Sequence, residues 1–365
     1  MTYFQAAKIE RENYLSETHL VTTEDGYMLT IYRIPGPPGS KSVLLQHGLL
    51  ASSESWTVAG RGFALAYILS DQGYDVWMGN FRGNTYSKKH IKLSTSDPLF
   101  WDFSMHELGI YDLPAIINYI TELRNDNLFY ISHSLGAPIL CIMAVERPEV
   151  SKKVKAMVGL APATYSYRMQ KVMKFISPFS RELKWIANSL GIYEFLPHSI
   201  IWDLFAKYIC RSVILRGPVC EGAIFSMAGL NLDQLNQTLL PKIWSQFPAG
   251  TSVKLVFHFL QQTATASFQN YDYGVRKNLK VYGNSKPPIY NLSKVQVPIA
   301  VFTSQNDWLI VEKDAMEFYD EIPIKIGIHE VEDKDFNHFD YLWATDAPNL
   351  VYSKVLDILK NQTSV

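Results

Sequence analysis

The stretch Asn127–Pro138, with the sequence NLFYISHSLGAP, decides the fold of this chain. Its first half is a short apolar run that predicts a buried strand over Leu128–Ser132, and its second half predicts a helix from Leu135 to about Val145. A strand that meets a helix at one sharp turn with a serine at its apex is the pattern of a nucleophile elbow, which holds the serine hydroxyl above the sheet. We therefore predict that Ser134 is a catalytic nucleophile.

The elbow needs small residues on both sides of the serine, because the strand and the helix approach each other closely there. Gly136 meets this need two residues after the serine. Ser132 stands two residues before it, where the pattern usually has glycine, and its side chain adds atoms to a crowded place. Since the motif alone also fits an ordinary turn rich in small residues, the partners of the serine must support the interpretation.

A nucleophilic serine needs a histidine base and a carboxylate that orients the base. In this setting the acid and the histidine follow the serine in that order. His338 lies in a loop after the last predicted strand, whereas His329 lies in an alternating pattern that indicates a half-buried strand. We predict that His338 is the base and that Asp307, in the loop after the strand 297–303, is the acid. Asp314 competes for this role, but its place in the following helix favours a solvated face.

The tetrahedral oxyanion is expected to bind two backbone N–H groups. One belongs to Leu135, directly after the nucleophile, and the other to Leu49, in the loop after the predicted strand Val43–Gln46. His47 in the same loop is more often a structural residue than a base, and the side chain of His133 is expected to point away from the hydroxyl.

Strands and helices alternate along most of the chain. A β-hairpin is predicted over about Glu17–Ile34, and the further strands are Val43–Gln46, Asp75–Met78, Leu128–Ser132, Val154–Gly159, Ile299–Thr303 and Lys325–Val331. This alternation predicts an α/β fold with a mostly parallel sheet and helices on both faces.

The alternation stops between residues 166 and 290, where the sequence reads as helical, with basic residues from Arg168 to Lys184 and many aromatic residues, among them Trp202 and Phe205. We predict a discontinuous core over residues 17–362, made of 17–165 and 291–362, with a helical cap or lid at 166–290. We predict that these aromatic residues offer an apolar surface to lipid acyl chains; the alternative is that they form the cap's own core.

Composition restricts the function classes. The 365 residues carry a net charge of −1, so the chain lacks the excess of positive charge that is typical of nucleic-acid-binding proteins. Of these residues 47% are hydrophobic, which is enough for a large core. The sequence contains no run of 18 or more charge-free apolar residues, so no transmembrane helix is predicted. Met1–Lys8 lacks the basic and apolar regions of a signal peptide. We expect no metal, no organic cofactor and no obligate protein partner.

A series of motifs through nearly the whole chain resembles the acid lipase family, the gastric and lysosomal acid lipases and their insect relatives within the α/β-hydrolase superfamily. Only about the first fifteen residues lack a match. The motifs are Val21–Tyr27, Gln46–Ser52, Gly73–Asn80, Arg82–Thr85, Phe100–Ser104, Tyr111–Ala115, Tyr271–Gly274, Pro287–Tyr290 and Asn337–Asp340. Carried over, the family's triad falls on Ser134, Asp307 and His338, and its oxyanion donors fall on Leu49 and Leu135.

The resemblance implies an α/β-hydrolase fold with a cap and a serine lipase or esterase activity. Such an enzyme hydrolyses carboxylic esters of neutral lipids, triacylglycerols or sterol esters, through an acyl-enzyme at a lipid–water interface. The alternatives are an esterase for small soluble esters and a catalytically weak lipid-binding relative whose elbow differs at Ser132.

Cysteines and glycosylation sequons bear on the cellular location. From the residues alone, Cys141, Cys210 and Cys220 would be free buried thiols in a cytosolic protein. The resemblance favours a Cys210–Cys220 disulfide in the cap. Sequons for N-glycosylation begin at Asn236, Asn291 and Asn361, the first two at positions where the family also tends to carry them. Together these features favour a secreted or lysosomal protein, with a cytosolic form as the alternative.

Overall fold

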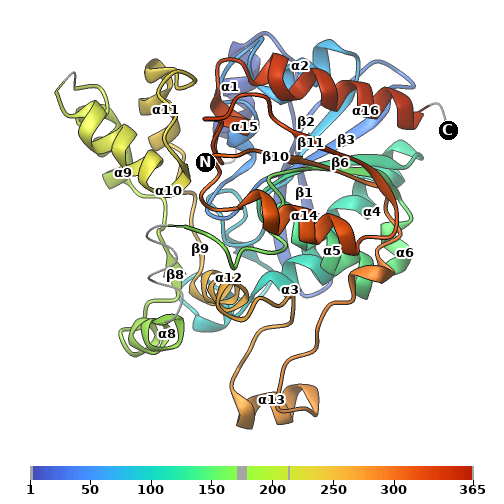
Figure 1. Cartoon of the computed structure of the whole chain (residues 1–365), viewed down its shortest axis with the longest axis vertical. Coiled ribbons are helices and arrows are strands. Elements are labelled where there is room, and N and C mark those ends of the chain that lie inside the picture. The colour runs from blue at the N-terminus through green and yellow to red at the C-terminus, as the bar shows by residue number, and fades with distance from the viewer. Residues whose placement is uncertain (1–2, 171–178, 213, 364–365) are drawn as a thin grey trace.

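The computed structural model describes residues 3–170, 179–212 and 214–363, and it contains one large central sheet (Figure 1). Its strands follow the order β1-β2-β4-β3-β6-β7-β10-β11, with β5 paired to β2. Their bounds are β1 Glu17–Thr22, β2 Tyr27–Ile34, β3 Ser42–Gln46, β4 Asp75–Met78, β5 Lys89–His90, β6 Leu128–His133, β7 Val154–Leu160, β10 Ile299–Thr303 and β11 Lys325–Glu330. The pairs from β4 through β3, β6, β7 and β10 to β11 are parallel, and β1 forms an antiparallel hairpin with β2. The predicted hairpin and the mostly parallel sheet are confirmed.

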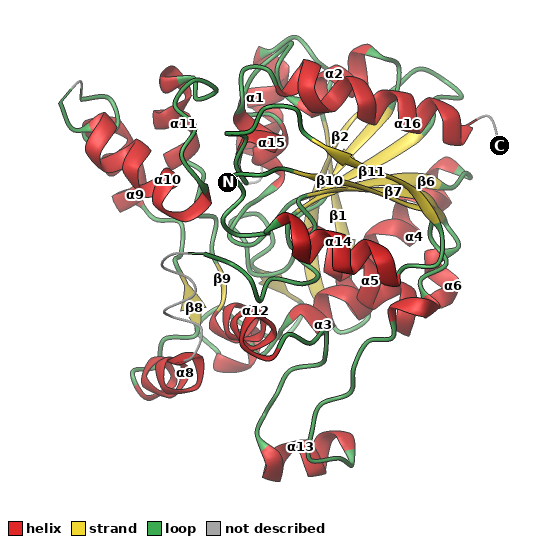
Figure 2. Cartoon of the chain, in the orientation of Figure 1, coloured by secondary structure: helices red, strands yellow, loops and turns green. Residues whose placement is uncertain are grey.

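Helices cover both faces of this sheet, as the alternation predicted (Figure 2). The helices α2 (Leu65–Asp71) and α16 (Ser353–Thr363) lie on one face, and α4 (Leu113–Arg124), α5 (Gly136–Glu146) and α14 (Glu312–Glu321) lie on the other. Every residue of β3, β4, β6 and β10 is buried, because a parallel strand between two helical layers has no face open to water. Four further helices, α1, α3, α6 and α15, span Tyr3–Arg11, Met105–Glu107, Pro148–Ser151 and Asp340–Trp343.

The segment between β7 and β10 contributes no strand to the central sheet among its described residues. It holds α8 Ser180–Ser189, β8 Glu194–Phe195, α9 Ile200–Tyr208, α10 Gly222–Ala228, α11 Leu240–Trp244, β9 Thr251–Ser252, α12 Val253–Thr265 and α13 Val275–Tyr282. Figure 1 shows α9 to α11 to one side of the sheet, α8 next to α12 below them, and α13 projecting from the body. Residues 171–178, part of the predicted basic stretch, lie outside the described residues.

A disulfide between Cys210 and Cys220 joins the end of α9 to the segment before α10, as the resemblance implied. Cys141 is a free, buried thiol in α5. No helix of the described chain is long and apolar enough to cross a membrane.

Candidate active site

Ser134 occupies the sharp turn between β6 and α5, and its backbone φ is +54°, a left-handed conformation that is uncommon for a residue other than glycine. Its N–H donates to the carbonyl oxygen of Leu160 at 2.9 Å, which fixes the turn to the neighbouring strand β7. A strained backbone held by surrounding structure is typical of functional sites. The local geometry is therefore that of a nucleophile elbow.

The elbow is as crowded as the sequence predicted. A Cβ on Gly136 would lie 2.9 Å from the Cβ of Ser132, and a Cβ on Gly48 would lie 2.9 Å from the Cβ of Ser134. Ser132 is fully buried, and its Oγ has no hydrogen-bond partner among the described residues. The serine in place of the usual glycine thus fits, because Gly136 opposite it has no side chain.

His338 and Asp307 lie in direct contact. The Nδ1 of His338 is 2.7 Å from Oδ2 of Asp307, and both side chains are buried. The other carboxylate oxygen of Asp307 accepts hydrogen bonds from the backbone N–H groups of Leu309 (2.9 Å) and Ile310 (2.7 Å). A carboxylate held in this way fixes the imidazole with its proton on Nδ1, so that Nε2 keeps a lone pair for a proton from elsewhere.

Ser134 and His338 line the same cavity, whose volume is about 490 Å³. The remaining lining is almost entirely apolar. From the predicted cap it includes Leu183, Ala187, Ile192, Phe195, Leu196, Met227, Phe247, Val253, Val256, Phe257, Phe259 and Leu260, and from the core Leu49, Leu50, Leu309, Ile310, Phe339, Leu342 and Trp343. A mostly apolar cavity with a few converging polar groups is the usual form of a small-molecule site.

The two predicted oxyanion donors lie beside this cavity. Leu49 lines it, and both Leu49 and Leu135 line a small adjoining recess next to His47. Within the described chain, the backbone N–H groups of Leu49 and Leu135 have no hydrogen-bond acceptor. Two amides without an acceptor beside a serine are suited to bind a developing negative charge.

His47 stabilises the loop that carries Leu49, as predicted. Its Nε2 accepts a hydrogen bond from the N–H of Phe81 at 3.2 Å, so its Nδ1 carries the proton and donates to the carbonyl oxygen of Gly48 at 2.8 Å. Burial lowers the pKa of His47 to about 4. A neutral histidine engaged at both ring nitrogens is a structural residue.

His133 stabilises the loop of the candidate base. Its Nε2 lies 2.8 Å from the carbonyl oxygen of His338, to which it donates, and the two rings have centroids 4.7 Å apart. Burial lowers the pKa of His133 well below its usual value. His133, directly before Ser134, therefore holds the loop that carries His338.

The two rejected candidates lie elsewhere. His329 is a residue of the edge strand β11, with its ring against Phe302. The expectation that Asp314 lies on a solvated helix face is wrong: it is fully buried in α14, and its carboxylate pairs with Arg168 at 2.6 Å. Burial raises the pKa of Asp314. Asp314 needs Arg168 because an isolated carboxylate in the interior would be costly.

The aromatic residues of the cap differ in their surroundings, and Trp185 and Tyr208 are exposed. Trp202 and Phe205 do not line the cavity; their rings pack on Trp244, with centroids 5.9 and 5.3 Å away. We predicted that these two residues offer a surface to acyl chains, but the structure favours the alternative, because both side chains are half-buried and pack on Trp244 instead. Phe195, in contrast, lines the cavity.

Sequence reasoning missed a junction in which the segment Ala228–Asn231 joins the loops of the candidate acid and base. The carbonyl oxygen of Ala228 accepts from the N–H of Trp308 at 3.2 Å, and that of Leu230 accepts from Nδ2 of Asn306 at 2.8 Å. Nδ2 of Asn231 donates to Oδ2 of Asp340 at 2.8 Å.

The same Asp340 oxygen accepts the N–H of Asn337 at 2.8 Å, beside His338. Burial raises the pKa of Asp340 to about 7. The glycine at position 229, which directly follows α10, was the available signal for this junction. It gave no information about which loops it meets.

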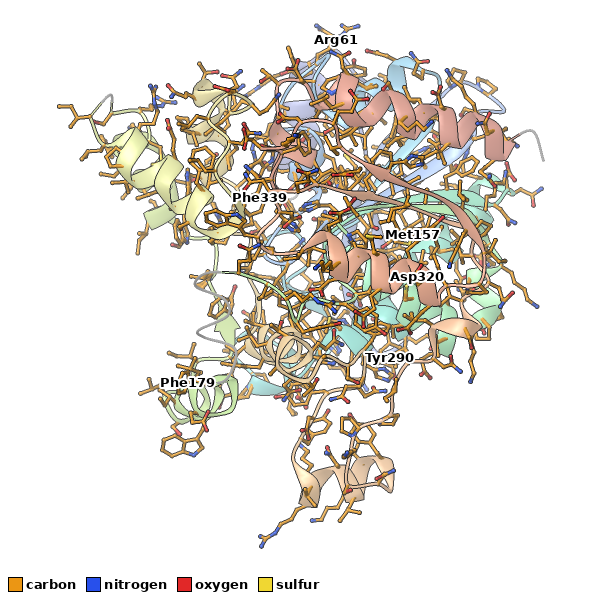
Figure 3. All side chains as sticks on the ribbon, in the orientation of Figure 1. Arg61, Met157, Phe179, Tyr290, Asp320 and Phe339 are labelled. Atoms are coloured by element: carbon orange, nitrogen blue, oxygen red, sulfur yellow. A yellow bond between two sulfur atoms is a disulfide. The ribbon has the colours of Figure 1, made fainter. Side chains whose placement is uncertain are left out.

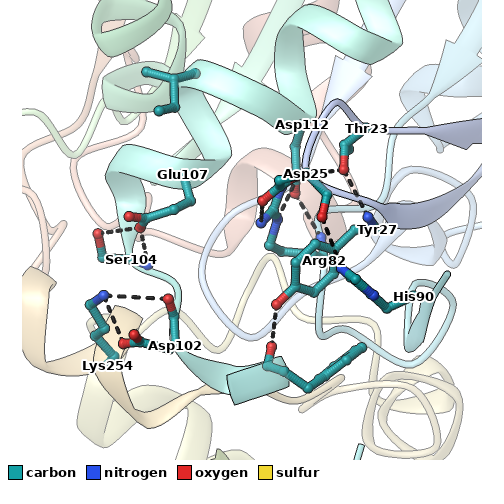
Figure 4. Close-up of polar contacts among 12 residues, drawn as sticks. Thr23, Asp25, Tyr27, Arg82, His90, Asp102, Ser104, Glu107, Asp112 and Lys254 are labelled. Atoms are coloured by element: carbon teal, nitrogen blue, oxygen red, sulfur yellow. Dashed lines mark hydrogen bonds and ion pairs between the residues drawn. The ribbon is translucent and has the colours of Figure 1, made fainter. Parts of the chain in front are cut away.

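A polar cluster around the buried Arg82 lies next to the site (Figure 4). The guanidinium of Arg82 pairs with Asp25 and Asp112, each at 2.6 Å. Burial raises the pKa of Asp112 to about 6, although the neighbouring Arg82 opposes the shift. Since Arg82 follows Phe81, whose N–H donates to His47, the cluster supports the loop that carries Leu49 and has a structural role.

No group of three or more His, Cys, Asp or Glu side chains in the described ranges is arranged to hold a metal ion.

Comparison with known proteins identifies similar chains along almost the whole length. Residues 6–60 match the family model described as a partial alpha/beta-hydrolase lipase region, and residues 41–190 match the model for the alpha/beta hydrolase fold. The chain is 39% identical over 355 residues to Lipase 1 of Drosophila melanogaster, covering 96% of this chain and 78% of that protein. It is 36% identical over 354 residues to human lysosomal acid lipase/cholesteryl ester hydrolase, covering 94% of this chain and 88% of that protein.

Solved structures share the fold at low sequence identity. A soluble variant of monoglyceride lipase from Saccharomyces cerevisiae, in complex with a substrate analogue, superposes with a TM-score of 0.56 at 16% identity, covering 94% of each chain. An alpha/beta hydrolase fold protein from Nakamurella multipartita superposes with a TM-score of 0.55 at 12% identity, covering 94% of this chain and 99% of that one.

Proposed function

Because the chain belongs to the acid lipase family of α/β-hydrolases, a family of carboxylic ester hydrolases, we propose that it cleaves the ester bonds of neutral lipids with Ser134, His338 and Asp307 as its catalytic triad. The observation that carries this proposal is the 2.7 Å contact between His338 and Asp307 beside the same apolar cavity as the strained Ser134.

The reaction follows from the arrangement of these groups. Ser134 Oγ attacks the ester carbonyl carbon while Nε2 of His338 accepts the hydroxyl proton. The N–H groups of Leu49 and Leu135 stabilise the oxyanion, and Asp307 stabilises the imidazolium. The protonated His338 then gives its proton to the leaving alcohol. Water, activated by the same imidazole, releases the acid from the acyl-enzyme, and no cofactor takes part.

The cavity supports a substrate with a long acyl chain. Nearly all of its lining is apolar, and each buried methylene contributes about 0.8 kcal/mol to binding. Triacylglycerols and sterol esters both offer such chains, and one human relative is named a cholesteryl ester hydrolase. An esterase for small soluble esters is the second candidate, because the chemistry at Ser134 does not itself require a long chain.

We further propose a secretory or lysosomal route. The Cys210–Cys220 disulfide is typical of an oxidising compartment. The sequon residues Asn291 and Asn361 are exposed and Asn236 is half-exposed, so all three are accessible to glycosylation.

The test begins with fluorophosphonate labelling, followed by hydrolysis of tributyrin, a long-chain triacylglycerol and a cholesteryl ester from acidic to neutral pH. Ser134→Ala is expected to lose label and roughly a million-fold in turnover. Asp307→Asn is also expected to be severely impaired, since it misorients the imidazole. His329→Ala, on the edge strand, is the control and keeps its activity. An active Ser134→Ala enzyme would rule out the mechanism, and preference for butyrate over every long-chain ester would favour the small-ester esterase.

A further inference from the structure

The segment 272–289, which we call the arm, projects from the body of the protein and ends in the helix α13 (Figure 1). We propose that the arm docks the protein onto a lipid surface that contains anionic phospholipid. This inference rests on the proposed function in one respect, namely that the substrate is presented at a lipid surface.

The arm is held together by hydrogen bonds, which also join its two ends at the base. The N–H of Asn270 donates to the carbonyl oxygen of Pro288 and the N–H of Tyr290 to that of Phe268, both at 2.9 Å. The buried Tyr290, labelled at the base in Figure 3, also donates its hydroxyl to Oδ1 of Asn270 at 2.9 Å.

Inside the arm, the buried side chain of Asn278 connects its parts. Its Nδ2 donates to Oδ1 of Asp272 at 2.7 Å and to the carbonyl oxygen of Ser285 at 2.9 Å, while its Oδ1 accepts the N–H of Tyr273 at 2.9 Å. Because these contacts use the polar interior of the arm, its tip is held in one shape before it meets any partner, which lowers the entropic cost of docking.

Positive charge is concentrated on the arm. It carries four basic residues and one acidic residue, Asp272, in a protein whose net charge is −1. Arg276, Lys277 and Lys280 are exposed on α13, and Lys286 is exposed beside it. In the part of the chain that the structure describes, Arg276, Lys280 and Lys286 make no ion pair. These cations are therefore available to an anionic partner.

Large apolar side chains stand exposed next to these cations. Val275 and Leu279 lie one helical turn apart on the same face of α13 and are 61% and 52% exposed. Val281 and Ile289 are 52% and 70% exposed. A basic helix with an uncovered apolar face fits the boundary between phosphate headgroups and acyl chains, where the cations meet phosphate and the apolar side chains leave water. This combination favours a lipid surface over a purely polyanionic partner such as nucleic acid.

The arm is connected to the wall of the catalytic cavity. Tyr271, at its base, packs in one apolar cluster with Val253, Val256 and Phe257 of α12. The same three residues line the cavity that contains Ser134. Docking through the arm would thus hold the helix that forms this wall close to the lipid from which substrate enters.

Co-sedimentation of the Ser134→Ala protein with vesicles tests the proposal without hydrolysis of lipid. One vesicle preparation is phosphatidylcholine alone, and the other contains about one-third phosphatidylglycerol, which supplies the negative surface potential. We expect at least about tenfold tighter binding to the anionic vesicles, weakened by salt. Adding the triple change Arg276→Gln, Lys277→Gln and Lys280→Gln should weaken that binding on the order of 100-fold, since each cation near such a surface contributes about fivefold.

A matched control removes three exposed lysines from distant elements, with Lys152→Gln, Lys313→Gln and Lys354→Gln. It has the same loss of charge and should bind within a few-fold of the parent. Equal losses in both triples, or equal binding to both vesicle types, would overturn the proposal. If Val275→Ser with Leu279→Ser left vesicle binding unchanged while the arm triple abolished it, the arm would be a general polyanion site and the lipid assignment would be wrong.

When the arm changes are made in the protein that keeps Ser134, it should hydrolyse a soluble butyrate ester at the parent rate, because no residue of the arm lines the cavity. Unchanged vesicle binding in arm variants that hydrolyse butyrate would be a failure of the arm proposal alone, whereas a parent protein that binds anionic vesicles but does not hydrolyse butyrate would be a failure of the proposed enzyme activity alone.

Discussion

Replacing Gly229 with alanine should disable the active site from a position outside it. Gly229 has φ +118° and ψ 151°, a region of backbone conformation that side chains strongly disfavour. An added Cβ would lie 2.1 Å from the carbonyl oxygen of Asn306 and 3.1 Å from the Cβ of Asn337. These two residues directly precede the candidate acid Asp307 and the candidate base His338, so one methyl group presses on both loops.

The magnitude follows from the geometry. The contact with the Asn306 oxygen is about 1.3 Å shorter than an ordinary contact of about 3.4 Å, and a backbone atom must move to relieve it. A displacement of about 1 Å at a catalytic group costs on the order of 100-fold in rate. We therefore expect kcat/KM for a soluble butyrate ester to fall on the order of 100-fold. The backbone strain itself should lower the free energy of unfolding by about 1–3 kcal/mol.

Gly274→Ala separates these two effects. Gly274 has φ +85° and ψ 154°, close to the conformation of Gly229, but no atom lies within 4 Å of the position of an added Cβ. The control should show a similar loss of stability with nearly normal butyrate hydrolysis. Rates and thermal melts of both variants decide the matter. Near-normal activity of Gly229→Ala, or an equal loss of activity in Gly274→Ala, would refute the argument that the junction positions the two loops.

Three further predictions concern single sites. Ser132→Ala removes a buried hydroxyl without a partner and should keep activity while raising the free energy of unfolding by up to about 1 kcal/mol, measured by denaturant unfolding; Ser132→Gly should also be active, and a large loss of activity without unfolding would give Ser132 a positive role. Asp340 has a pKa raised by burial to about 7 in the folded protein against an ordinary value of 3.8, so the folded state holds a proton that the unfolded state releases, and stability from this group falls as pH rises from about 4 to 7. Asp340→Asn, whose amide oxygen can still accept from Asn231 and Asn337, should therefore melt higher than the parent at neutral pH and similarly to it near pH 4; a shift confined to acidic pH would contradict the reasoning. Trp202→Ser with Phe205→Ser should lower butyrate and long-chain hydrolysis together with the melting temperature, because both rings pack on Trp244; a selective loss of long-chain hydrolysis at an unchanged melting temperature would place these rings in the substrate path.

Much of the sheet and the identity of the candidate triad could be predicted from the sequence because the signals are local. The apolar run before Ser134 is buried on both faces in β6, and the predicted bounds Asp75–Met78 and Ile299–Thr303 match β4 and β10. Chain order restricted the base to two histidines. The alternating pattern around His329 then identified it as a strand residue, since a period of two is a property of neighbouring residues.

Only the tertiary structure decided which distant side chains meet. Arg168 and Asp314 form an ion pair across 146 positions of sequence. The helix pattern around Asp314 therefore could not reveal that its carboxylate is buried and paired with a cation. Trp202 and Phe205 carry the same aromatic pattern whether they face Trp244 or a substrate. The contact of Asn231 with Asp340 spans 109 positions and links the cap to the loop of His338. A sequence pattern records whether a side chain prefers burial, whereas the partner that satisfies it is fixed by the packing of the whole chain.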